Sequence, residues 1–185
     1  MNSLTDNSLM LKVKSGDLDK MGLLFERYHR PLYRFLYHMT GDKDSCQDMV
    51  QNVFYRMLRY RHTFTGDGEF KTWMYHLSRN VLHDHVKQNK SLNHLDIHTL
   101  ADKLDNGIGA DMHLEDKDNA ESIQNALSLL SSEHREILIL SRFQELKYNE
   151  IAVILNISEG AVKVRVYRAM GELKKTFLKN NKRTV

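Results

Sequence analysis

Apolar side chains recur at every third or fourth position along most of this chain, and this period predicts α-helices. The alternation of apolar and polar positions that marks strands is rare, and one proline and nine glycines leave long stretches free to be helical. The helical pattern fills residues 1–91, fades over residues 92–119 and returns over residues 120–185. We therefore predict an all-α protein with two small helical domains joined by a flexible linker.

The first domain is divided into helices by recognisable end signals. Pro31 suits the first position of a helix, and Gly41 suits the position just after a helix end. Asp44 is the predicted N-cap of the next helix, and a loop with two glycines spans residues 61–69. The predicted helices cover residues 6–14, 17–27, 31–40, 44–60 and 70–87.

The second domain carries the pattern of a helix-turn-helix. A short apolar helix is predicted over residues 148–155, followed by Asn156, a residue that tolerates the left-handed conformation of a sharp turn. Ser158 is a good N-cap for the helix that follows. That helix has one apolar stripe, predicted to face the core, which consists of Val162, Val166, Ala169 and Leu173.

The other face of this last helix predicts contact with duplex DNA, because a basic and exposed N-terminal half is the form that enters a major groove. Lys163 and Arg168 can donate to guanine edges or phosphates, and Val164 can touch a thymine methyl group. Arg165 is predicted as a phosphate clamp or as a partner in an intramolecular pair. The alternative is a plain helical hairpin with solvated charges. The candidate DNA-binding residues are Ser158, Glu159, Lys163, Val164, Arg165, Tyr167 and Arg168.

Charge is distributed unevenly along the chain. The formal net charge is only +3, but residues 92–119 carry a net charge of −5 and the rest of the chain therefore carries +8. Two basic domains are thus joined by an acidic linker. Basic surfaces of this kind favour binding to nucleic acid.

The single cysteine, Cys46, excludes an intramolecular disulfide and a CxxC metal motif, and it is typical of a protein from a reducing compartment. The first ten residues lack the features of a secretory signal. No apolar run approaches the roughly 20 residues that span a bilayer. We expect a cytoplasmic protein with no direct membrane insertion.

Basic and aromatic residues are mixed around the loop at 61–69. This mixture suits single-stranded DNA, whose bases stack on rings and whose phosphates meet cations. Stacking contributes about 1–3 kcal/mol per base, which is comparable with the few kcal/mol needed to unstack a base. Capture of a base could therefore open a duplex without ATP. The alternative for Phe70 and Trp73 is a place in the core.

Three segments together carry a resemblance to a known family. DMVQNVF at residues 48–54 precedes a glycine-containing loop and FKTWMYHLSRN at residues 70–80, and the helix-turn-helix follows the linker. With these segments in this order, the chain resembles the extracytoplasmic-function (ECF) sigma factors of bacterial RNA polymerase. The resemblance implies region two in residues 1–91, the linker in 92–119 and region four in 120–185.

The resemblance also implies partners and roles. The partners are core RNA polymerase, single- and double-stranded promoter DNA and an anti-sigma factor. The helix-turn-helix would read the minus-thirty-five element. The residues for core polymerase are Asp48, Gln51, Asn52 and Phe54, and those for the minus-ten element are Arg61, Phe64, Lys71, Trp73, Arg79, Asn80 and His83.

The acidic linker allows three interpretations. The resemblance implies that it threads the polymerase active-site channel, where its charge would stand in for RNA. It could instead be a solvated spacer, since 28 extended residues reach at most about 90 Å. A third interpretation is that it folds back on the basic domains and inhibits them.

Two further functional classes remain open from the residues alone. One is a stand-alone helix-turn-helix regulator with a sensing N-terminal domain. The other is a metal-dependent hydrolase that would use some of the ten histidines. Neither an HExxH motif nor a catalytic Ser/His/Asp order is present, so we expect no enzyme, no cofactor and no metal site.

Overall fold

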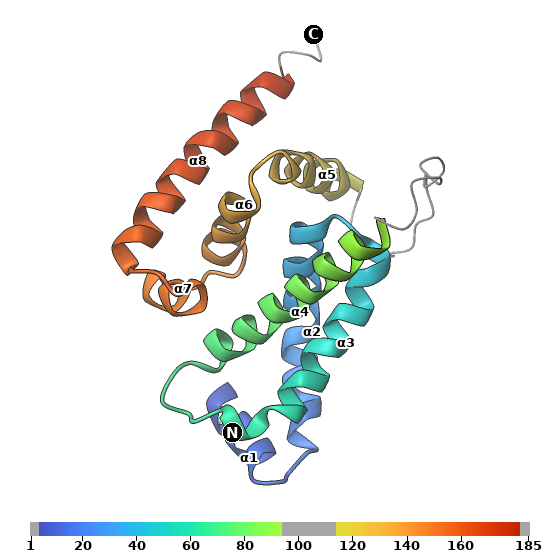
Figure 1. Ribbon diagram of the computed structural model, residues 1–185, viewed down its shortest axis with the longest axis vertical. Helices are drawn as coiled ribbons and strands as arrows, with labels where there is room; N and C mark the ends of the chain where they lie inside the picture. Colours follow the sequence, from blue (N-terminus) through green and yellow to red (C-terminus); the bar gives the residue numbers. More distant parts are fainter. Residues whose placement is uncertain (1–3, 94–113, 182–185) are drawn as a thin grey trace.

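The computed structural model describes residues 4–93 and 114–181, and within these ranges it contains helices and no strand (Figure 1). The all-α prediction is confirmed. The elements are α1 (Asp6–Lys14), α2 (Lys20–Thr40), α3 (Lys43–Arg59), the 3₁₀ turn η1 (Arg61–Thr63), α4 (Phe70–Asn93), α5 (Leu114–Ser128), α6 (Ser132–Leu138), the π-helical turn η2 (Ile139–Phe143), α7 (Tyr148–Leu155) and α8 (Glu159–Asn181).

The N-terminal domain consists of α1 to α4, with α2, α3 and α4 side by side and α1 at one end (Figure 1). Leu24, Leu32 and Met57 are fully buried between these helices. The rings of Phe35 and Tyr75 meet edge to face with 5.3 Å between their centroids. This arrangement fills the core that the helical period of the sequence requires.

The predicted break at Pro31 is wrong, because α2 runs without interruption from Lys20 to Thr40. A proline inside a helix removes one hydrogen bond and costs about 3 kcal/mol. The stripe that includes Leu24, Leu32 and Phe35 is buried on both sides of the proline, and burial of this stripe offsets the cost. The predicted end at Gly41 is confirmed, with φ of 72° there.

The N-cap of α3 is Asp42, not Asp44 as predicted. One carboxylate oxygen of Asp42 accepts hydrogen bonds from the backbone N–H groups of Asp44 (3.1 Å) and Ser45 (3.3 Å). The Ser45 hydroxyl donates to the other oxygen, and these bonds hold the pKa of Asp42 below its usual value. Two acidic residues, Asp42 and Asp44, lie at the start of this helix. Only the hydrogen bonds in the structure show which of them is the N-cap.

The helices on either side of the linker are longer than predicted. α4 continues to Asn93, and α5 begins at Leu114, ahead of position 120. Residues 94–113 of the predicted linker lie outside the described residues.

The helix-turn-helix forms as predicted. Asn156 is left-handed with φ of 53° between α7 and α8. The Ser158 hydroxyl accepts a hydrogen bond from the Ala161 N–H at 3.1 Å and so caps α8. Val162 and Ala169 are fully buried under α6 and α7.

The two domains pack against each other. α4 contacts α7, while α2 contacts α5 and η2 (Figure 1). The Tyr75 hydroxyl donates to the Gln144 side-chain oxygen at 2.5 Å. The Arg135 guanidinium donates to the carbonyls of Met39 (2.7 Å) and Leu127 (2.9 Å) and so joins the ends of α2 and α5. The linker therefore connects domains that already touch.

His38 lies within this contact between the domains. Its ring centroid is 4.8 Å from that of Phe143, and its Nδ1 is 2.8 Å from the Gln124 side-chain oxygen. Burial lowers the pKa of His38, against the effect of the Gln124 hydrogen bond, and the Arg34 charge lowers it further. The packed arrangement therefore favours the neutral imidazole.

Acidification should loosen the packing of the domains. When they part, the pKa of His38 returns toward about 6.5, so the parted form takes up the proton more readily below that pH. We expect the radius of gyration from small-angle scattering to rise between pH 7.5 and pH 5.5. His38→Gln cannot be protonated and should show a smaller rise. An equal rise in both proteins would contradict this role of His38.

Candidate functional site

The exposed face of α8 gathers most of the residues predicted to bind duplex DNA. Lys163, Val164, Tyr167 and Arg168 are all exposed, and Tyr167 is 82% exposed although it is a large aromatic residue. No core contact explains such a ring. The face therefore presents two cations, one aliphatic side chain and one ring for contact with a groove.

Two charged residues of α8 are engaged with neighbouring acids. The Lys163 ammonium is 3.0 Å from the Glu159 carboxylate one turn earlier, and both side chains remain about half exposed. Arg165 is 3.7 Å from Glu133 of α6. The structure thus places Arg165 in an intramolecular pair, one of the two predicted alternatives.

The loop at residues 61–69 packs on a cluster of aromatic side chains. Phe64 is 3% exposed, and its ring centroid is 5.4 Å from that of Trp73 and 6.2 Å from that of Phe70. Phe64 therefore supports the loop and has no free face for a base, contrary to its predicted role. Trp73 is half-buried, and its indole N–H donates to the Thr63 hydroxyl at 3.2 Å.

The remaining minus-ten candidates do not form one continuous face. Asn80 and His83 lie on an exposed stripe of α4 that also contains His76 and Lys87, at spacings of four, three and four residues. Lys71 is exposed nine residues before Asn80, which places it on the opposite side of α4. His76 and Lys87 were not among the predicted residues, and their spacing from Asn80 could have indicated them.

Arg79 and Arg61 are occupied within the protein. The Arg79 guanidinium donates to Glu136 of α6 at 2.6 Å and to the Ile154 carbonyl of α7 at 2.7 Å. Arg61 donates to the Leu58 carbonyl at 2.7 Å. In the packed arrangement of the domains, therefore, neither guanidinium is fully available to phosphate.

The predicted polymerase-binding residues are divided between surface and core. Asp48, Gln51 and Asn52 are exposed along one face of α3, as expected for a docking surface. Phe54 is 6% exposed and packs against Phe25, so it supports this surface from inside. Tyr55, which is 60% exposed, joins the face; its spacing from Gln51 and Asn52 could have indicated it.

The C-terminal domain also has an apolar groove bounded by α5, η2 and α8. Ile123, Met170 and Phe177 are exposed along it, which is unusual for such large apolar side chains on a free surface. Arg142 and Lys174 are part of the lining and add positive charge. The groove has the character of a surface for an amphipathic helix.

Over residues 4–93 and 114–181, no cluster of histidine, cysteine and acidic residues could hold a metal ion. Nor does any helix there combine the length and the apolar character needed to cross a bilayer. Cys46 is buried, and burial raises the pKa of its thiol to about 11.

Sequence comparisons identify both domains. Residues 24–92 match Sigma-70 region 2, and residues 120–173 match Sigma-70, region 4. The chain is 31% identical over 157 residues to the ECF RNA polymerase sigma factor SigX of Bacillus subtilis (strain 168), covering 83% of this chain and 81% of that protein. It is 30% identical to the ECF RNA polymerase sigma factor SigM of the same organism, covering 83% and 93% respectively.

Solved structures share the fold. The structure of CnrH in complex with the cytosolic domain of CnrY superposes with a TM-score of 0.72 at 19% identity, over 92% of this chain and 95% of that one. RpoE in complex with the anti-sigma factor NepR from Bartonella quintana gives 0.71 at 20% identity, over 85% and 96%. The matches to both sigma-70 regions and the relatives at 30–31% identity show that the chain belongs to the ECF RNA polymerase sigma factors of the sigma-70 family.

Proposed function

We propose that this protein recruits core RNA polymerase to promoters and opens them, without catalytic residues of its own, in the cytoplasm. Residues 1–91 would serve core polymerase and the minus-ten element, residues 92–119 the linker, and residues 120–185 the minus-thirty-five element. The main support is the presence of both sigma regions, in order, each with an exposed polar or basic face. A stand-alone regulator would need only the helix-turn-helix.

Promoter opening would begin from the packed arrangement of the domains. Two promoter elements about two DNA turns apart are separated by roughly 70 Å. We infer that the domains, which are joined through the Arg79–Glu136 ion pair in the free chain, part when both elements are bound. Parting would release the Arg79 guanidinium for the DNA backbone.

We also propose an anti-sigma factor as a partner. The structures of similar fold include complexes with CnrY and with the anti-sigma factor NepR. The exposed face of α3, with Asp48 and Tyr55, and the apolar groove bounded by α5 and α8 are the surfaces best suited to a protein partner. An inhibitor that covers the α3 face would compete directly with polymerase.

The central experiment is run-off transcription on genomic DNA with core polymerase. We expect site-selective initiation only when this protein is added. A regulator would instead bind its operator tightly without core enzyme. Selective starts that do not depend on the protein, or none in its presence, would contradict the proposal.

Loss of a cation from the α8 face should weaken promoter binding. We expect Lys163→Ala and Arg168→Ala each to cost about 1–3 kcal/mol in holoenzyme affinity for a minus-thirty-five duplex. Lys175→Ala, which removes the same charge from an exposed position further along α8, is the control. Losses no larger than that of the control would move the DNA-reading face elsewhere.

Charge reversal on α3 should weaken assembly with polymerase. Asp48→Lys is expected to reduce affinity for core enzyme by about tenfold or more, because a like charge at a complementary interface is repelled. Asp19→Lys is the matched control, since Asp19 is exposed and its side chain caps no helix. Binding can be followed by the fluorescence anisotropy of labelled sigma factor.

Substitutions of Arg79 and of Glu136 should have the same effect on domain packing but different effects on promoter opening. We expect Arg79→Ala and Glu136→Gln both to increase the radius of gyration of the free chain, because both remove the ion pair between the domains. Only Arg79→Ala should also reduce promoter opening, measured by permanganate reactivity of unpaired thymines. Asp84→Asn removes the Arg56 pair within one domain and should change neither measurement. Equal opening by both variants would exclude a DNA role for Arg79.

A further inference from the structure

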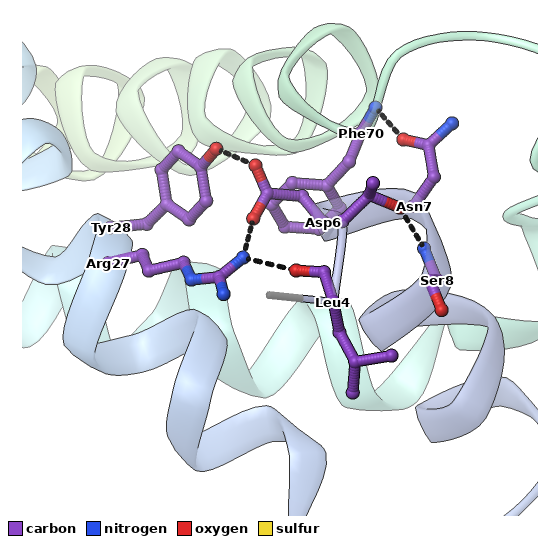
Figure 2. A network of polar contacts seen from close by, with 8 residues as sticks. Leu4, Asp6, Asn7, Ser8, Arg27, Tyr28 and Phe70 are labelled. Carbon is purple, nitrogen blue, oxygen red and sulfur yellow. Dashed lines mark hydrogen bonds and ion pairs between the residues drawn. The ribbon is translucent and has the colours of Figure 1, made fainter. Parts of the chain in front are cut away.

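Helix α1 lies ahead of the Sigma-70 region 2 match, which begins at residue 24, yet it touches the candidate minus-ten loop directly. The Asn7 side-chain nitrogen donates to the Gly68 carbonyl at 2.9 Å and reaches the Gly66 carbonyl at 3.5 Å. The Asn7 side-chain oxygen accepts from the Phe70 N–H at 2.8 Å (Figure 2). One amide thus joins the end of the loop to the first residue of α4.

Two more residues of the same helix face hold the rest of the loop. The Lys14 ammonium donates to the Phe64 carbonyl at 2.7 Å. The Leu11 side chain lies 3.3 Å from the position where a Cβ of Gly66 would stand, and Gly66 has φ of +86°. Asn7, Leu11 and Lys14 are four and three residues apart, so they form one stripe of α1. The residues of α1 that are buried in the core, Leu9, Met10 and Val13, lie outside this stripe.

The helix that carries this stripe is itself fixed to α2. Figure 2 shows the Asp6 carboxylate between the Tyr28 hydroxyl, which donates to it, and the Arg27 guanidinium, 2.6 Å away. Arg27 also donates to the Leu4 carbonyl at 3.0 Å, and Thr5 caps α1. A rigid support on one side and three contacts on the other are the requirements for positioning a loop.

We propose that α1 is a positioning element for the minus-ten loop, with Asn7 and Lys14 as its positioning residues. Their donors occupy the carbonyls of Phe64, Gly66 and Gly68, so these carbonyls are turned away from an incoming base. Exposed side chains of the loop, which include Thr65, Asp67 and Glu69, are left to select the base. This inference rests on the proposed role of the loop in minus-ten binding.

Positioning predicts a selective defect. A loop released from α1 must be ordered when the base binds, which costs affinity at that step and at no other. Asn7→Ala and Lys14→Met should each weaken holoenzyme binding to a single-stranded minus-ten oligonucleotide by about tenfold. Binding to core polymerase and to a minus-thirty-five duplex should not change. The preference for the correct base over the other three should also fall, an effect that general destabilisation would not produce.

Neighbouring residues of α1 provide matched controls. Ser8→Ala is the control for Asn7→Ala, and Lys12→Met removes the same charge as Lys14→Met from an exposed position two residues earlier, on a different face of α1. Asn7→Asp keeps the acceptor for the Phe70 N–H and loses the donor to Gly68, so it should give an intermediate loss. Melting temperatures of all variants, measured on the full chain, identify any that fail to fold.

The outcomes distinguish the inference from the function on which it rests. If Asn7→Ala and Lys14→Met behave like their controls while Trp73→Ala abolishes oligonucleotide binding, the loop binds DNA but α1 does not position it. An equal loss of binding to core polymerase and both DNAs would also overturn the inference, because α1 would then act through folding alone. If wild-type holoenzyme does not bind the oligonucleotide, the proposed minus-ten role itself fails.

Discussion

The Arg79 guanidinium links the two halves of this protein. Arg79 of α4 pairs with Glu136 of α6 and donates to a carbonyl in the last turn of α7, where a helix accumulates partial negative charge. The carboxylate is only 14% exposed and the arginine 31%. Ion pairs in such places define a geometry more than they add stability. The packing of α4 on α7 and the burial of His38 belong to the same arrangement.

Local rules were sufficient for much of the chain. The helix over residues 6–14, the turn at Asn156 and the cap at Ser158 were predicted from sequence and found in the structure. Each depends on neighbours within about one helical turn: a side chain that caps, a residue that tolerates positive φ, an apolar stripe of period 3.6. The same rules placed the exposed residues of α8.

The predictions differed from the structure where the structure depends on contacts between residues far apart in the sequence. Pro31 stays inside α2 because the helices packed on either side stabilise the continuous stripe. Phe54 and Phe64 are aromatic residues, which can serve either in a binding surface or in a core. Only the tertiary packing shows that both are buried. Arg79 was predicted to contact DNA, and its bonds to Glu136 and Ile154, 57 and 75 residues away in the chain, were not predicted. Sequence periodicity carries no information on such pairs.

The buried thiol of Cys46 has a practical and a chemical consequence. Only the thiolate reacts readily with oxidants and alkylating reagents, and burial raises the pKa of this thiol to about 11, so that it stays protonated at neutral pH. The same inertness means that cysteines introduced on α3 and α8 would accept fluorophores selectively, without removal of the native residue, so that the separation of the domains could be followed during transcription.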